Sequence, residues 1–295
     1  MKHVLCSLLI AFSVGITQGH AAEPARLNCQ IPLRQIVLIN PSKLRGHELV
    51  RLDEISNFQE TIFQLRKQHR FEKAQDIEDH VVKILKGLPF HSEAISSGAG
   101  GGRYYFFDEG IVGIGKRAGR HFATSVEAEV VAYQIDRLYN LNLVPLTLEK
   151  INSTGKMSLQ LFYKSAREAR SSRVPILEID RKKMQIFDYL IQNFDRKESN
   201  FLVNEKGEII AIDHGLSLHN ARSVPYSPHP PKLQELDLNF FMTTEGKAFL
   251  QKLKHTTDTQ IRMKLSPLLK AMTIESFIER KNLLLEQIEQ YDVGQ

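Results

Sequence analysis

The stretch that decides the fold is FDYLIQNFDRKESNFLVNEKGEIIAIDHGLSL, residues 187–218. It contains two short apolar runs separated by the turn-forming residues 204–207. This pattern predicts two antiparallel strands joined by a tight turn. Asp195 and Asn200 precede the first strand and Asp213 follows the second, so the paired strands should bring Asn200 and Asp213 close together.

These three side chains have the chemistry that phosphoryl transfer requires. That reaction needs positioning and compensation of phosphate charge, with little covalent help from the protein. Asp195 is predicted to orient an acceptor hydroxyl and to take its proton. Asp213 and Asn200 offer carboxylate and amide oxygens, which suit Mg²⁺ or Mn²⁺ and leave positions for phosphates and water. Gly215 permits a sharp backbone turn just after the metal ligand.

A glycine-rich segment lies further upstream, at residues 96–102, and predicted strands follow at 103–107 and 111–116. Glycines allow backbone N–H groups to approach phosphate oxygens closely. Lys116 ends the second of these strands, where its ammonium could reach the α- and β-phosphates of ATP. The predicted phosphate loop contains Gly98, Gly100, Gly101 and Gly102.

Residues 124–139 have the apolar periodicity of an amphipathic helix. Thr124 and Glu127 have the spacing of a capping box at its start. Glu129, on this helix, is the predicted ion-pair partner of Lys116, and Glu127 is the alternative.

The remaining segments complete a domain around these motifs. Residues 55–88 predict two helices before the strands, and residues 147–148 and 158–162 suggest two further strands. Residues 163–165 are a candidate hinge, where backbone groups would meet adenine. The last predicted helix has apolar positions between 274 and 288.

At this point the sequence resembles a known group. The segments DYLIQNFDR (188–196), NFLV (200–203) and IDHG (212–215) are similar to the atypical kinases. That group includes phosphatidylinositol 3-/4-kinases, HipA-like kinases and the secretory-pathway Golgi casein kinases. The segment EVVAYQIDRL (129–138), followed by Val-Pro at 144–145, most resembles the secretory-pathway members. The resemblance covers about residues 95–220.

The resemblance implies a role for each motif residue. Asp195 would be the catalytic base, Asn200 and Asp213 the metal ligands, Lys116 the phosphate contact and Glu129 its partner. In ordinary protein kinases an arginine precedes the catalytic aspartate. Here Arg196 follows Asp195, as in the atypical group.

We therefore predict an α+β, two-lobed protein-kinase-like fold, with a small β-rich N-lobe and a mainly helical C-lobe. An N-terminal helical extension is expected at residues 22–92, and the catalytic domain at residues 93–295. Within that domain the N-lobe is expected at about 93–163 and the C-lobe at about 164–295.

Residues 1–21 have the pattern of a secretory signal peptide: a lysine, an apolar run at residues 4–16, and small residues before a cut near Ala21 or Ala22. Cys6 lies in this segment, so Cys29 alone remains and an intrachain disulfide is excluded. Removal of the signal peptide takes away one lysine, Lys2, and so lowers the formal net charge of +5 by one. The sequence predicts a secreted protein without a stable membrane span.

The expected activity is transfer of the γ-phosphate of ATP to a hydroxyl acceptor, chiefly on a protein. A lipid headgroup or a sugar is the second acceptor considered, and transfer of another part of the nucleotide, such as AMP, is the third possibility. Basic residues are scattered among acidic ones, which does not favour a nucleic-acid partner. ATP is scarce in a bacterial periplasm. An exported bacterial protein of this kind would either act where ATP is supplied, in a host compartment or secretory lumen, or use a different donor.

Overall fold

The computed structural model describes residues 55–95, 102–118, 125–153, 155–218 and 231–293. Chain contacts divide the protein into two units, Met1–Ile55 and Ser56–Gln295, and all the helices and strands below belong to the second. The predicted signal peptide, Cys29, and the glycines at 98, 100 and 101 lie outside the described residues.

An antiparallel five-stranded sheet forms the N-lobe, and its strand order is β1-β2-β3-β5-β4. The register aligns Lys116 with Ser158 on the neighbouring strand. The strands predicted on either side of the 108–110 turn and at 147–148 and 158–162 are confirmed. The sheet consists of β1 (His91–Ala94), β2 (Arg103–Phe106), β3 (Val112–Arg117), β4 (Thr147–Asn152) and β5 (Gly155–Leu161).

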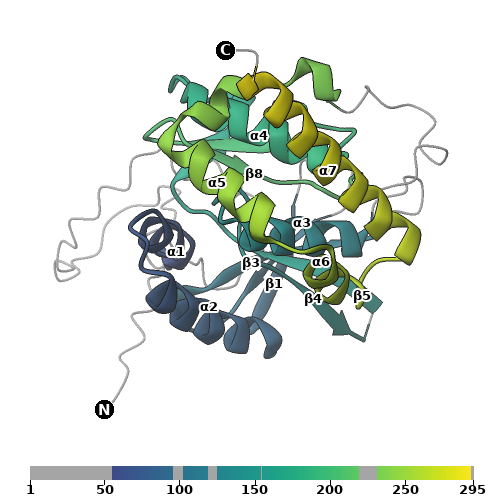
Figure 1. The fold of residues 1–295 in the computed structure, drawn as a ribbon. Coiled ribbons are helices and arrows are strands. Elements are labelled where there is room, and N and C mark those ends of the chain that lie inside the picture. Colours follow the sequence, from purple (N-terminus) through teal and green to yellow (C-terminus); the bar gives the residue numbers. More distant parts are fainter. Residues whose placement is uncertain (1–54, 96–101, 119–124, 154, 219–230, 294–295) are drawn as a thin grey trace, which may run out of the picture. The chain divides into compact units, whose positions relative to one another are not determined.

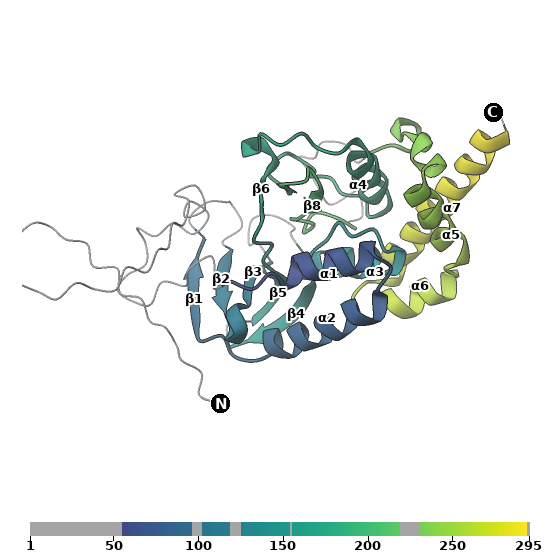
Figure 2. The ribbon, with the colours of Figure 1, turned by 90° about the vertical axis from the view of Figure 1, so that its left-hand side faces the viewer.

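Two helices, α1 (Phe58–Lys67) and α2 (Phe71–Lys86), pack against each other (Figure 2). Their apolar faces enter the core of the five-stranded sheet, where Ile62 and Leu85 are buried together with Leu159. Each such side chain stabilises the fold by roughly 1.5–3 kcal/mol. The sequence analysis placed these helices outside the catalytic domain. In the structure they share the apolar core and the compact unit of the sheet, since their apolar faces are buried against it.

Helix α3 (Val126–Tyr139) packs against β4 and β5. Its cap is Ser125, whose hydroxyl oxygen accepts a hydrogen bond from the backbone N–H of Ala128 at 3.1 Å. The predicted cap, Thr124, lies outside the described residues. A buried stripe that includes Val131 and Ile135 faces the core of the C-lobe, so α3 contacts both lobes.

A three-stranded antiparallel sheet, in the order β6-β7-β8, underlies the predicted catalytic segment. Its strands are β6 (Ala166–Glu168), β7 (Phe201–Asn204) and β8 (Ile209–Ala211). The predicted strand–turn–strand is thus confirmed, with Phe201 opposite Ala211. Gly207 closes the turn at φ +80°, a conformation that favours glycine.

Four α-helices make up most of the remaining described C-lobe, and Figure 1 shows α4 (Glu178–Leu190) beside β8 of the small sheet. Residues 162–165 connect the two sheets, which is where the hinge was predicted. Within the described residues, no helix is long and apolar enough to cross a membrane. The four helices are α4, α5 (Thr244–His255), α6 (Asp258–Leu265) and α7 (Ala271–Val293).

Candidate active site

Lys116 on β3 lies between two carboxylates that come from different parts of the chain. Its Nζ is 3.3 Å from Oε1 of Glu129 on α3 and 3.0 Å from Oδ1 of Asp213, which follows β8. Burial by itself lowers the pKa of the Lys116 ammonium, but the charges of Glu129 and Asp213 outweigh this and hold that pKa above its ordinary value. The lysine is therefore fully charged at neutral pH.

Glu129 joins the two lobes through its two oxygens. While Oε1 contacts Lys116, Oε2 accepts the backbone N–H of His214 at 3.0 Å. A second contact lies beside it, because the backbone N–H of Ser125 donates to the carbonyl of Gly215 at 2.8 Å. Burial disfavours the ionised carboxylate, yet the Lys116 charge and the His214 hydrogen bonds hold the pKa of Glu129 far below its usual range.

Glu127, the alternative partner of Lys116, points elsewhere. Its Oε1 is 2.9 Å from Nζ of Lys156, and its Oε2 accepts a hydrogen bond from Ser125. The structure thus brings Glu129, and not Glu127, to Lys116.

The loop between α4 and β7 carries Asp195 and Asn200, which contact each other directly. The amide Nδ2 of Asn200 donates to the backbone carbonyl of Asp195 at 2.7 Å and to its Oδ2 at 2.9 Å. Lys197 Nζ also contacts Oδ2, at 3.1 Å, and no contact within the described residues falls on Oδ1. Oδ1 is therefore the oxygen available to an acceptor hydroxyl, and the Asp195 side chain is 25% exposed.

Asn200 and Asp213 lie on adjoining backbone, since the N–H of Ile212 donates to the carbonyl of Asn200 at 3.2 Å. With its Nδ2 occupied by Asp195, the Asn200 amide presents Oδ1, which among the described residues accepts only the Ser199 hydroxyl, at 3.1 Å. Asp213 has φ +60°, and its side chain is 43% exposed.

These two oxygen donors fit a Mg²⁺ or Mn²⁺ ion that takes its remaining ligands from nucleotide phosphates and water. Among the described residues there is no cluster of three or more histidine, cysteine, aspartate or glutamate side chains able to hold a metal ion alone.

Arg196 is a site residue whose role the sequence analysis missed. Its guanidinium forms a two-pronged pair with the buried Asp188 of α4, with both N–O distances at 2.9 Å. It also donates to the backbone carbonyls of Asn200 and Ile212, the latter at 2.8 Å. Arg196 thus ties together α4, the loop that carries Asp195 and Asn200, and the strand before Asp213. The available signal was Asp188 among the apolar residues just before the catalytic aspartate candidate, because a buried carboxylate needs a partner.

His214 lies beside Asp213 and is fully buried. Its ring meets the Phe187 ring edge-on at 5.8 Å between centroids. Burial lowers the pKa of His214 below its ordinary value, so the imidazole is neutral at pH 7. The ring also approaches Glu129, since its Nδ1 lies 3.6 Å from Oε2 of that carboxylate.

The predicted phosphate loop joins β1 to β2. Of its four glycines only Gly102 is described, and its carbonyl accepts the backbone N–H of Ile95 at 2.9 Å. Strand β2 pairs with β3, which ends at Arg117 beside Lys116.

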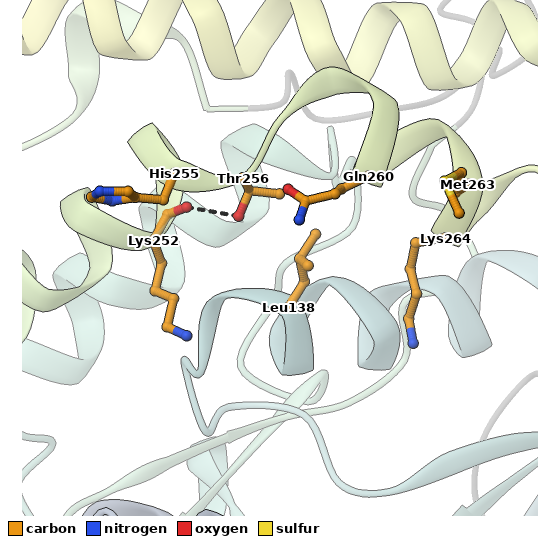
Figure 3. Close-up of a pocket in the computed structure, with 7 residues that line it drawn as sticks. All are labelled: Leu138, Lys252, His255, Thr256, Gln260, Met263 and Lys264. Carbon is orange, nitrogen blue, oxygen red and sulfur yellow. Dashed lines mark hydrogen bonds between the residues drawn. The ribbon is translucent and has the colours of Figure 1, made fainter.

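A separate cavity of about 590 Å³ lies between α3 and the helices α5 and α6 (Figure 3). The Thr256 hydroxyl donates to the backbone carbonyl of Lys252 at its edge. None of the predicted site residues lines it, so it is not the candidate active site. Its lining residues are Leu138, Lys252, His255, Thr256, Gln260, Met263 and Lys264.

With this geometry in place, the chain can be compared with known proteins. The family model of phosphatidylinositol 3- and 4-kinases matches residues 118–281, more than half of the 295 residues. The fold and site define an atypical kinase-like protein, and the chain belongs to the phosphatidylinositol 3- and 4-kinase family. Lys116 lies two positions before the matched range.

A curated relative is Protein Rv2133c of Mycobacterium tuberculosis, which is 27% identical over 127 residues. The match covers 31% of this chain and 46% of the relative, so the chain spans about half the length of that protein.

Among solved structures, hydra Fam20 with sugar has a TM-score of 0.52 at 15% identity, covering 72% of this chain and 88% of that one. A Golgi casein kinase with Mn/ADP bound has a TM-score of 0.47 at 15% identity, covering 72% and 76%. The Fam20 likeness confirms the predicted kinase-like α+β fold. Family membership confirms the assignment to the atypical kinase group and supports the prediction of a phosphotransferase.

Proposed function

We propose that this protein transfers the γ-phosphate of ATP to a hydroxyl group, with a protein as the acceptor. The observation that carries the proposal is the position of Lys116, with Glu129 3.3 Å and Asp213 3.0 Å from its ammonium. Lysine and carboxylates in this arrangement suit a nucleotide triphosphate with its metal ion, since the lysine can bind phosphate while Asp213 faces the metal.

The residues divide the reaction between them. The Oδ1 of Asp195 accepts the proton of the acceptor hydroxyl as the hydroxyl oxygen forms its bond to the γ-phosphorus. The bond from that phosphorus to the bridging oxygen breaks at the same time, and ADP leaves with the electron pair. Lys197, paired with Asp195 through Oδ2 at 3.1 Å, adds positive charge beside the reacting phosphate.

Asp213 and Asn200 would hold the divalent cation. When bound, Mg²⁺ or Mn²⁺ neutralises the charge that develops on the phosphate oxygens.

A lipid headgroup is the second candidate acceptor, because the matching family is that of the phosphatidylinositol 3- and 4-kinases. A lipid headgroup would need free basic side chains near the site, and the basic run at residues 181–183 does not supply them. Arg181, Lys182 and Lys183 are each paired with a carboxylate, at 3.6, 2.6 and 2.7 Å. This pairing leaves little free positive charge for an anionic surface, which supports the protein acceptor.

The apolar run at residues 4–16 supports export of the protein from the cytoplasm. Cell fractionation of the full-length chain beside a chain lacking residues 1–21 tests this. Recovery of both in the cytoplasm would contradict export.

The activity is tested with γ-labelled ATP, Mg²⁺ or Mn²⁺, and separate pools of proteins, phosphoinositides and sugars. We expect the parent to label the protein pool, and the Asp195→Ala and Asp213→Ala variants to lose the label by a factor of about 10² or more. Arg262→Ala, which removes an exposed ion pair far along the chain, is the matched control and keeps the parent rate.

Each other outcome has a defined meaning. Label in the lipid or sugar pool overturns the protein acceptor and keeps the kinase. Label from α-labelled but not from γ-labelled ATP identifies AMP transfer instead. Absence of metal-dependent ATP binding contradicts the whole proposal.

A further inference from the structure

Helix α3 is anchored at its second half by a buried charge cluster. The Glu78 carboxylate of α2, whose side chain is 4% exposed, pairs with Arg66 of α1 and with Arg137 of α3. The Arg137 Nε lies 3.4 Å from Oε2 of Glu78. Burial and the nearby charge of Glu78 raise the pKa of the Tyr133 hydroxyl, which is also on α3.

The cluster lies on the helix that carries Glu129. Tyr133 is about one turn beyond Glu129 and Arg137 about two turns, which places Arg137 roughly 12 Å along the axis. Because a helix moves as a rigid rod over this length, a contact at Arg137 constrains the position of Glu129.

Helix α1 is itself fixed at three points outside the cluster. The Gln59 side-chain oxygen accepts the backbone N–H of Leu146, ahead of β4, at 2.8 Å. Glu60 accepts the backbone N–H of Ser165, in the connection between the sheets, at 3.0 Å. In addition, Lys67 pairs with Glu208 in the β7–β8 turn at 2.5 Å. Helix α1 therefore contacts both lobes. Because α2 packs against α1, these contacts also fix the place of Glu78.

We propose that Glu78 and Arg137 are positioning residues, which hold α3 so that Glu129 stays paired with Lys116. This inference rests on the proposed function, because it concerns the lysine that binds the nucleotide. It gives α1 and α2 a role that their place before the sheet does not reveal.

Directional contacts explain why the cluster, and not the apolar face of α3, sets the position. Val131 and Ile135 pack into the C-lobe core, and apolar contacts tolerate small rotations or shifts. The ion pairs of a buried carboxylate tolerate them less well, because they depend on the distance and direction between the charged atoms. Burial raises the pKa of Glu78 against the lowering effect of Arg66, so the carboxylate depends on its cationic partners to stay ionised.

The test is a double-mutant cycle between Arg137→Ala and Glu129→Gln. Arg137 is substituted, and not Glu78, because the ion pair between Arg66 and Glu78 then stays intact. The contact between α1 and α2 is thereby kept. We expect Arg137→Ala to lower kcat/KM for ATP by about threefold to tenfold, with the loss mainly in KM. Arg137→Lys keeps the charge and should recover most of the loss.

The decisive variant is the double mutant. If Arg137 acts through Glu129, adding Arg137→Ala to Glu129→Gln changes neither kcat/KM nor the affinity for Mn²⁺ and ADP any further. The inference would be overturned if the loss of kcat/KM in the double mutant equalled the product of the losses in the two single mutants. A single-mutant effect no larger than that of the Arg262→Ala control would overturn it as well.

Nucleotide affinity, measured by calorimetry with Mn²⁺ and ADP, keeps this test separate from the acceptor question. If the unsubstituted protein binds nucleotide but labels no acceptor pool, the double-mutant cycle can still be measured through nucleotide affinity alone. A parent that binds no nucleotide contradicts the proposed function, and this inference falls with it.

Discussion

The two halves of the candidate site are built in different ways. Asp195, Asn200 and Asp213 lie within 19 residues, and a hairpin and a short loop arrange them. Lys116 and Glu129 reach the same place through a sheet and a helix, and 97 positions separate Lys116 from Asp213. The first half is fixed by local chain geometry, whereas the second depends on how distant elements pack. Substitutions in the two halves should therefore fail in different ways.

The largest effect is expected at Arg196, which supports the local half. Arg196→Met should lower the free energy of unfolding by about 3–5 kcal/mol, because the buried Asp188 carboxylate loses its partner. Urea denaturation measures this loss. Combining Arg196→Met with Asp188→Asn should recover much of the stability, and an unchanged midpoint for the single variant would contradict the role given to Arg196.

The hairpin turn gives the next effect. A Cβ at Gly207 would lie 2.3 Å from the backbone carbonyl oxygen of Pro175, and the backbone there has φ +80°. Gly207→Ala should cost about 2–3 kcal/mol in thermal or urea unfolding.

Gly155→Ala is the matched control for that substitution. The backbone at Gly155 has φ +113°, but no atom lies within 4 Å of the added Cβ. It should cost only about 1 kcal/mol. Equal losses for the two variants would show that the contact with Pro175 does not matter.

A pH effect is expected in the long-range half, at Asp136 on α3. Burial raises the pKa of Asp136 from 3.8 to about 6, although the N–H groups of Leu143 and Val144 and the charges of Arg66 and Lys183 oppose this. The folded state then binds the proton more tightly than the unfolded state. The contribution of Asp136 to stability is therefore full below about pH 4 and is lost as the pH rises through about 6.

Asp136→Asn removes this dependence and keeps an oxygen that can accept the same N–H groups. Between about pH 4.5 and pH 7.5, the stability of the parent relative to this variant should fall by about 2 kcal/mol. Urea unfolding of both proteins across that range measures the difference, in which other titrating groups cancel. A constant difference would contradict the raised pKa.

The smallest effect is expected where α1 meets the hairpin. The pair between Lys67 and Glu208 is partly exposed, so Lys67→Ala should lower stability by only about 0.5 kcal/mol, and less at high salt. A double-mutant cycle with Glu208→Ala isolates the pair. A coupling well above 1 kcal/mol would show that α1 fixes the C-lobe more strongly than its other contacts indicate.

The accuracy of the sequence analysis follows the same division. The hairpin and the spacing of Asp195 and Asn200 could be predicted because each depends on neighbours in the chain. The cap of α3 was placed one residue early, at Thr124 instead of Ser125, because both residues can accept the capping hydrogen bond. Helices α1 and α2 were found by their periodicity, but the surface that their apolar faces cover was not.

The sequence by itself determined the kinase-like class and the strand–turn–strand after Asn200, since strand alternation, turn residues and short spacing are local properties. Only the tertiary structure decided that Glu129, and not Glu127, meets Lys116, and that Arg196 joins Asp188 to the strand before Asp213. It also decided that the apolar faces of α1 and α2 pack into the core of the five-stranded sheet. These are contacts between distant residues, formed when apolar faces are buried and the charges among them need partners, and no local pattern specifies which partner each will find.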